Sequence, residues 1–200
     1  MKKKTFLLVF FVMMAAGFGL FYFFRLKLYP AAIVNGAWVG ARELERRSHA
    51  AAQYYDKALL TYKLEDGTTP PRDAVEREIR RAVLDKLIEN IIVSEELRTR
   101  LGEEEARAAV ERKVNGASFK TDEVASAVKE LYGFTLDEFR DIILVPQAER
   151  ELLEDQFSNA EEGAFTKWLD GVREAAKVTM FAHLFRWNNG QVELKAAQKE

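Results

Sequence analysis

The chain has 200 residues, of which 48% are hydrophobic and 31% are charged, so it can form one globular domain with a substantial core. The net charge of −2, and the lack of a Lys/Arg stripe beyond the first residues, argue against a nucleic-acid partner. The absence of cysteine excludes disulfides, thiolate metal sites and cysteine nucleophiles.

An uncharged run of 20 residues occupies positions 5–24, and a helix of that length can cross a bilayer. Three lysines precede the run, whereas Arg25 and Lys27 follow it, so the positive-inside rule favours a cytoplasmic N-terminus. A cleaved signal peptide is the alternative, because residues 15–17 are small. The apolar run continues to Phe24, however, and we therefore expect an uncleaved anchor. The expected organisation is a cytoplasmic basic tip (1–4), a transmembrane anchor (5–24), a tether (25–32) and an extracytoplasmic domain (33–200).

The domain is predicted to open with a hairpin and a helix. Asn35 and Gly36 lie between apolar residues, and this pair is typical of the two positive-φ positions of a tight turn, so Ile33–Val39 is expected to be a β-hairpin. Residues 41–64 then have the apolar spacing of a helix. The segment 65–71, which contains a glycine and two prolines, is expected to end it.

The longest predicted helix is Asp73–Leu101, and the rest of the chain is expected to pack around it. Its apolar face widens and rotates along the helix, which predicts different partners at its two ends. Thr68 and Thr69 offer a cap, two prolines follow, and Gly102 suits the C-terminal end. Two i,i+4 ion pairs are expected on its exposed side: Glu76–Arg80 and Glu96–Arg100.

Three further helices are predicted in the middle of the chain. They cover residues 103–114, residues 122–132, and a segment from Thr135 towards Phe157. Thr135 and Glu138 have the spacing of a capping box, so the third of these helices has a well-marked start. Pro146 removes a backbone hydrogen bond within it and is expected to produce a kink.

The closing segment, residues 160–194, is predicted to contain one helix and several strands. Asn159 and Glu162 have capping spacing ahead of a helix whose apolar face carries Phe165, Trp168, Leu169 and Val172. Residues 177–181 are typical of a strand, and residues 185–194 of a hairpin that turns at Asn189-Gly190.

A two-stranded hairpin alone is marginally stable, so the strand at 178–181 is expected to pair with the hairpin at 33–39. That pairing would tie the start and the end of the domain together in a small sheet. It is also expected to bring Trp38 near Trp168 or Trp187.

No group of residues has the pattern of a catalytic or metal site. The acidic runs at 103–105 and 161–162 lie at the starts of predicted helices, where carboxylates complement the helix dipole. His49 and His183 lie in unrelated surroundings, and neither has a second histidine or a cysteine with which it could bind a metal. The serines lack a G-x-S-x-G setting, and no glycine-rich phosphate loop is present. We therefore expect no metal and no cofactor.

Aromatic residues are the remaining signal for a binding site. Core packing is the simplest explanation for any single one of them. Several short helices around one long helix nevertheless rarely cover every apolar face, so some aromatic side chains are expected to line an open cradle. The candidates are Tyr54, Tyr55, Tyr62, Phe119, Tyr132, Phe134 and Phe139.

Four short motifs follow one another in an informative order: Ile33–Gly36 (IVNG), Val83–Asn90 (VLDKLIEN) running to Gly102, Glu103–Ala106 (EEEA) and Gly133–Arg140 (GFTLDEFR). In this order they resemble the opening hairpin and helices of the N-terminal chaperone domain of SurA-, PrsA- and PpiD-type foldases. The stretch from Trp168 to Val178 also resembles the closing helix and strand of such domains. The resemblance covers about residues 33–157. It implies a mainly α fold in which a small β-sheet joins the N- and C-terminal ends of a helical chaperone domain.

One departure from that family is large, because many relatives carry a parvulin prolyl isomerase domain ahead of the closing helix. Only a few residues separate Phe157 from Ala164, so no such domain fits and isomerase activity is not expected. The resemblance then implies a membrane-anchored holdase, periplasmic or at the cell surface, that binds apolar or extended segments of unfolded or nascent exported proteins. The alternative is a structural subunit that docks permanently on a membrane or secretion complex. The sequence indicates no particular oligomeric state.

Overall fold

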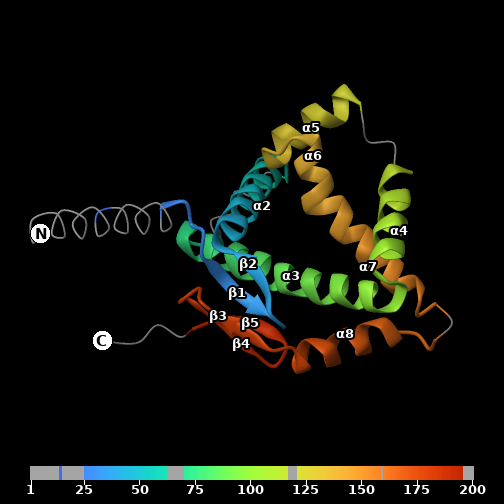
Figure 1. The fold of residues 1–200 in the computed structure, drawn as a ribbon. Helices are drawn as coiled ribbons and strands as arrows, with labels where there is room; N and C mark the ends of the chain where they lie inside the picture. Colours follow the sequence, from blue (N-terminus) through green and yellow to red (C-terminus); the bar gives the residue numbers. More distant parts are fainter. Residues whose placement is uncertain (1–13, 15–24, 63–69, 117–120, 159, 196–200) are drawn as a thin grey trace, which may run out of the picture.

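The structure, a computed structural model, describes residues 14, 25–62, 70–116, 121–158 and 160–195. Within these ranges the fold is mainly helical with a small antiparallel sheet (Figure 1), which confirms the predicted fold class at that level. The predicted anchor at residues 5–24 lies outside these ranges except for Met14. None of the helices within the described ranges is long and apolar enough to cross a membrane.

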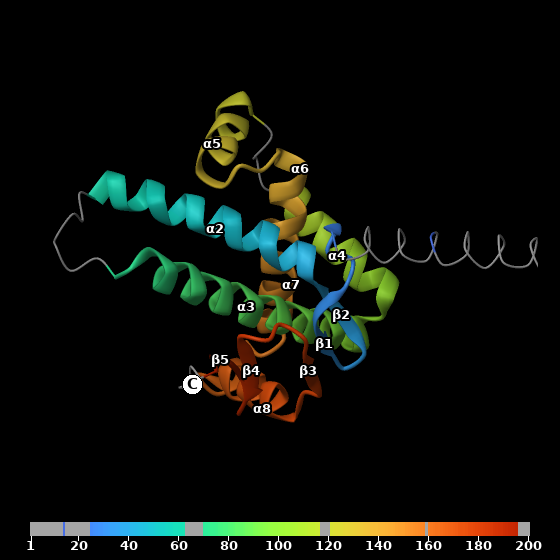
Figure 2. The same ribbon diagram turned by 90° about the vertical axis from the view of Figure 1, so that its left-hand side faces the viewer.

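Two long antiparallel helices form the centre of the molecule (Figure 2). They are α2 (Ala41–Tyr62) and α3 (Arg72–Leu101), close to their predicted bounds. With 30 residues, α3 is about 45 Å long. It ends at Gly102, whose φ of 83° costs glycine little. At its start no side chain caps the helix, and the predicted cap at Thr68 and Thr69 lies outside the described residues.

The apolar face of α3 has different partners at its two ends, as predicted. Leu84 and Ile88 are fully buried in a first core with the sheet and the start of α2. Val93 and Leu97, further along, are buried in a second core with α4, α7 and α8. Both cores therefore depend on α3.

Shorter helices pack around α3 and across the middle of α2. They are α4 (Glu103–Asn115), α5 (Asp122–Tyr132), α6 (Leu136–Phe139), the π-helical turn η1 (Arg140–Leu144), α7 (Val145–Asp155) and α8 (Ala164–Ala175). The predicted capping box at α6 is confirmed. The Glu138 N–H donates to the Thr135 hydroxyl at 3.2 Å, and the Thr135 N–H donates to the Glu138 carboxylate at 2.8 Å.

The start of α8 differs from the prediction. Gly163 precedes the helix with a φ of 81°, and no side chain caps it. Gly163 adopts a left-handed conformation directly before α8, so the helix begins at Ala164. The capping pattern of Asn159 and Glu162 predicts an earlier start. Asn159, the other half of that pattern, lies outside the described residues.

The small sheet joins the two ends of the domain. Its strands are β1 (Pro30–Val34), β2 (Ala37–Gly40) and β3 (Val178–Met180), in the order β2-β1-β3, and all neighbours are antiparallel. The positive φ angles of Asn35 and Gly36, 50° and 97°, confirm the predicted turn. A separate hairpin, β4 (Phe185–Asn188) with β5 (Gln191–Leu194), follows β3 and packs on α3.

The expected meeting of tryptophans does not occur. Trp38 is 64% exposed, and it makes no ring contact with another aromatic residue of the described ranges. Side chains alternate between the two faces of a strand, so the burial of Val39 in the core places Trp38 on the outer face. Trp187 packs against the first core, and Trp168 packs against the second.

Candidate functional site

Four of the candidate aromatic residues come together where α5 and α6 meet α2. The ring centroid of Tyr132 lies 5.2 Å from that of Tyr54, with the planes 1° apart. The same ring lies 6.3 Å from Phe134 and 5.7 Å from Phe139. We call these four residues the aromatic cluster. Core packing explains part of it, since Phe134 is buried together with Ala50 and Val128.

Gly133 allows the rings of Tyr132 and Phe134, on either side of it, to pack against each other. It ends α5 in the left-handed conformation, with a φ of 70°, so the chain reverses between the two rings. The side-chain amide of Gln53 on α2 donates to the carbonyl of Glu130 at 2.8 Å and holds the end of α5 in place. Burial, with a smaller contribution from Tyr54, raises the pKa of the Tyr132 phenol, which therefore stays protonated at neutral pH.

The other three candidates do not join the cluster. Tyr55 is half-buried on α2 and makes no ring contact within the described ranges. Phe119 lies outside the described residues, as does the side chain of Tyr62.

An apolar pocket of about 410 Å³ opens beside the aromatic cluster, between α2, α3 and α7. Tyr132 and Phe134 form one side of it. Such a volume lies within the range of roughly 300–1,000 Å³ that is usual for ligand-binding cavities. We use the name apolar pocket for the space lined by Arg47, Ala50, Ala51, Val83, Lys86, Leu87, Asn90, Tyr132, Phe134, Ile142, Ile143, Pro146, Gln147 and Arg150.

The wall formed by η1 exists because of Pro146. In an α-helix the N–H of residue 146 would donate to the carbonyl of Ile142, but proline has no N–H. The chain forms the π-helical turn η1 just before this proline, and Nη1 of Arg47 donates to the Ile142 carbonyl at 3.2 Å. This bond links α2 to η1. The side chain of Ile143, the next residue of η1, is 37% exposed and lies on the wall of the pocket.

Three basic residues surround this apolar surface. Lys86 lies 2.6 Å from the Glu89 carboxylate, Arg150 pairs with the same carboxylate, and Arg47 pairs with Glu43 at 2.7 Å. Burial by itself would raise the pKa of Glu89. The hydrogen bond from Lys86 and the nearby basic charges outweigh that effect, so the pKa is lowered and Glu89 stays ionised at neutral pH.

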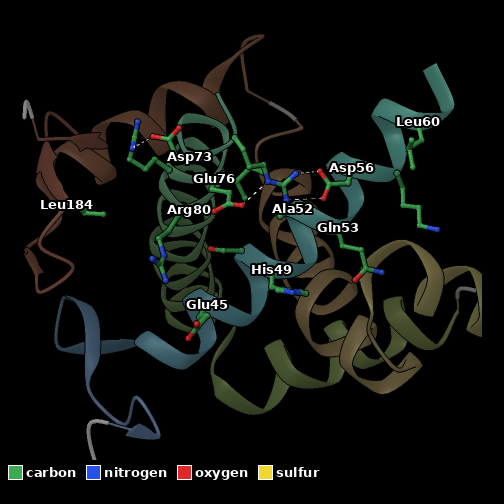
Figure 3. Close-up of a pocket in the computed structure, with 15 residues that line it drawn as sticks. Glu45, His49, Ala52, Gln53, Asp56, Leu60, Asp73, Glu76, Arg80 and Leu184 are labelled. Carbon is green, nitrogen blue, oxygen red and sulfur yellow. Dashed lines mark hydrogen bonds and ion pairs between the residues drawn. The ribbon is translucent and has the colours of Figure 1, made fainter. Parts of the chain in front are cut away.

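A second and more polar cleft, of about 810 Å³, lies on another face of α2 and extends along the start of α3 (Figure 3). Arg72 bridges its two walls through Asp56 and Glu76. Glu76 therefore pairs with Arg72 and not with Arg80 as predicted, because Arg72 lies one turn earlier on the same side of α3 and also reaches α2. The predicted Glu96–Arg100 pair is confirmed, with an N···O distance of 2.6 Å.

The charged cleft, as we name this second space, contains His49 but no arrangement of metal ligands. Within the described ranges, no three His, Asp or Glu side chains lie close enough together to hold a metal ion. Leu60, 72% exposed, stands at the outer end of the cleft (Figure 3). The apolar pocket is consequently the better candidate for a binding site, since it combines aromatic, aliphatic and basic groups in one concave surface.

Sequence reasoning missed most of the aliphatic lining of the apolar pocket. Val83, Leu87, Ile142 and Ile143 come from two separate segments, and no local pattern marks them as neighbours. The one local signal was Pro146, which predicted an irregular helix at this place. Comparison of the chain with family models, curated proteins and solved structures finds no significant match in any of the three.

Proposed function

We propose that the protein is a membrane-anchored extracytoplasmic chaperone that holds apolar or extended segments of exported proteins, without prolyl isomerase activity. The observation that carries this proposal is the apolar pocket beside the aromatic cluster. The uncharged run at residues 5–24 supports the anchor, and the order of motifs resembling SurA-, PrsA- and PpiD-type domains supports the chaperone role.

The chemistry of the pocket suits short apolar segments. Its volume is small for a folded partner but sufficient for a few side chains of an extended chain. Tyr132 and Ile143, which are partly exposed, offer apolar contact, and Arg150 and Lys86 at the edge favour segments that carry carboxylates next to their apolar residues. A holdase needs many weak and reversible contacts of this kind, because it has to release its clients.

Site-specific photo-crosslinking in cells tests the site. A photoreactive phenylalanine analogue is placed at Ile143 in the apolar pocket, and at Leu60 in the charged cleft as the matched control. Leu60 is the more exposed of the two, at 72% against 37%, so accessibility alone favours the control. We expect a broad set of crosslinked exported proteins from position 143 and few from position 60. Equal yields from the two positions would overturn the assignment of the pocket.

The same experiment separates the chaperone from the accessory subunit. A single crosslinked partner, copurifying in a fixed ratio, would favour a subunit of a membrane or secretion complex.

Aggregation of an unfolded client provides a biochemical test, because the purified full chain should suppress it. Ile143→Asp should weaken this suppression severalfold, whereas Leu60→Asp should not. In a proline-limited refolding assay the protein should not accelerate refolding.

The anchor requires its own test. Protease added to spheroplasts should digest the domain at residues 25–200, because the charge distribution favours a cytoplasmic N-terminus. Full protection would show the opposite orientation. A mature protein that begins near residue 18 would show a cleaved signal peptide instead.

A further inference from the structure

We propose that the loop between β3 and β4, Phe181–Leu184, is a second membrane contact that lies in the headgroup region of the bilayer beside the anchor. This inference rests on the anchor of the proposed function, but it concerns a surface that the client-binding proposal does not use. We call these four residues the membrane loop.

The membrane loop presents large apolar side chains to solvent. Phe181 is 52% exposed and Leu184 is 38% exposed, and the loop contains no acidic residue. Leu26 and Leu28 of the tether are 49% and 51% exposed. Single exposed apolar residues are ordinary on a protein surface, but Phe181 and Leu184 lie within one four-residue loop, and the two exposed leucines belong to the segment to which this loop is hydrogen-bonded.

Hydrogen bonds hold the membrane loop beside the tether. The backbone N–H groups of Phe181 and Ala182 both donate to the carbonyl of Ala31, at 2.9 and 3.0 Å. Lys27, Tyr29, Phe181 and Leu184 line one shared cleft. Two segments separated by 150 positions in the sequence therefore meet at the place where the chain leaves the predicted anchor.

The tether is too short to let this surface move far from the bilayer. Six residues separate Phe24, the end of the uncharged run, from Ala31, and the seven Cα–Cα steps between them span at most about 25 Å when fully extended. The tether is also bent and docked, because Lys27 has a φ of 52° and pairs with Glu45 on α2. The N–H of Ala41 donates to the carbonyl of Tyr29 at 2.9 Å. The domain thus begins almost directly at the membrane surface.

The chemistry of the membrane loop matches the boundary between headgroups and acyl chains. Phenylalanine and leucine side chains gain free energy when they enter this layer, and nearby cations are attracted to anionic lipids. Arg25, at the start of the tether, is such a cation. An anchor on a short tether and an apolar loop at the same end would give the domain two contacts with the bilayer and so fix its orientation.

Single-cysteine labelling of the full chain tests the proposal, since the protein has no native cysteine. Phe181→Cys, Leu184→Cys and, as a control, Leu60→Cys are each labelled with an environment-sensitive fluorophore. Ala16→Cys reports on the anchor, and His183→Cys replaces Phe181→Cys if that variant does not fold. The proteins are reconstituted into vesicles of phosphatidylcholine and phosphatidylglycerol, with and without a nitroxide-labelled lipid as quencher.

We expect severalfold stronger quenching at positions 181 and 184 than at position 60. If position 16 is quenched while positions 181 and 184 behave like position 60, the membrane loop is refuted and the anchor stands. If none of the four positions is quenched, both the anchor and the membrane loop are wrong. Quenching at 181 and 184 without quenching at 16 would support the membrane loop and reject the anchor.

Discussion

The Nη2 atom of Arg173 on α8 lies 2.8 Å from each carboxylate oxygen of Asp85 on α3, and this contact fastens the end of the chain to the central helix. Nη1 of Arg173 donates to Glu89 at 2.7 Å, and Nε donates to the carbonyl of Gly190 at 2.8 Å. Asp85 also accepts the N–H of Val192 at 2.9 Å. One buried guanidinium thus joins α3, α8 and the β4–β5 hairpin.

Replacing Arg173 by methionine should lower the free energy of unfolding by about 3–5 kcal/mol, because the partly buried carboxylate of Asp85 loses its charged partner and Glu89 loses one of three. Denaturant unfolding of the full chain in detergent micelles measures this loss. Arg186→Met is the control, since Arg186 pairs with Glu193 at the surface and should cost at most about 1 kcal/mol. Equal losses in the two variants would show that burial of the Arg173 pair is not what matters.

Phe185→Ala should cost about 3–5 kcal/mol, because Phe185 is only 1% exposed and its removal leaves a cavity in the first core. Leu194→Ala on the paired strand is the control, since Leu194 is 37% exposed and its loss should be much smaller. Deletion of residues 178–200 removes β3 and the whole hairpin, so it should destabilise the domain at least as much as Phe185→Ala. Thermal unfolding provides the comparison, and an unchanged melting temperature after the deletion would contradict the closure.

The stacked pair Tyr54–Tyr132 should show a coupling free energy of about 0.5–1.5 kcal/mol in a double-mutant cycle with alanine. The parallel rings and the 5.2 Å centroid distance favour a direct interaction. Unfolding of the two single variants and the double variant gives this coupling. The pair Tyr55–Tyr132, which has no ring contact, is the control, and strictly additive effects for Tyr54 would show that the stack contributes nothing.

Glu149→Gln should leave the protein as stable as the wild type, or more stable, at pH 7. Burial raises the pKa of Glu149, and the 2.8 Å hydrogen bond from Ser94 opposes this only in part. Because the folded-state pKa is above the unfolded one, stability falls as the pH rises from about 4.3, the ordinary glutamate value, through the folded-state pKa. Glutamine cannot ionise and avoids that loss.

The difference between Glu149→Gln and wild type should consequently shrink on acidification towards pH 4. Melting temperatures measured across this range test the trend. Glu154→Gln, at an exposed position on the same helix, controls for the removal of one negative charge. A variant that is clearly less stable than the wild type at pH 7 would contradict the prediction.

Several local features were predictable because their physical cause lies within a few residues. The turn at Asn35-Gly36 needs two positive φ angles, and the capping box needs a hydroxyl and a carboxylate three positions apart. The length of α3 follows from its apolar spacing and from Gly102. The start of α8 was wrong because the backbone conformation of Gly163 overrode the capping pattern.

The candidate site was predictable only in part. The sequence selects aromatic residues, and Tyr54, Tyr132, Phe134 and Phe139 do meet, but that meeting depends on how α5 and α6 lie on α2. The aliphatic wall could not be predicted, because Ile143 faces the pocket only after η1 adapts to the proline that follows it.

The sequence predicts most of the helices, turns and strands, since hydrophobic spacing and backbone preferences act over short distances. It also supplied the reason for the closure, because a two-stranded hairpin needs a third strand. Which charges pair in the interior depends instead on how distant segments pack together. Arg173 lies 88 positions from Asp85 and 84 from Glu89, among 30 basic and 32 acidic residues, and the packing of α8 and the hairpin on α3 brings these groups together and shields them from most of the solvent.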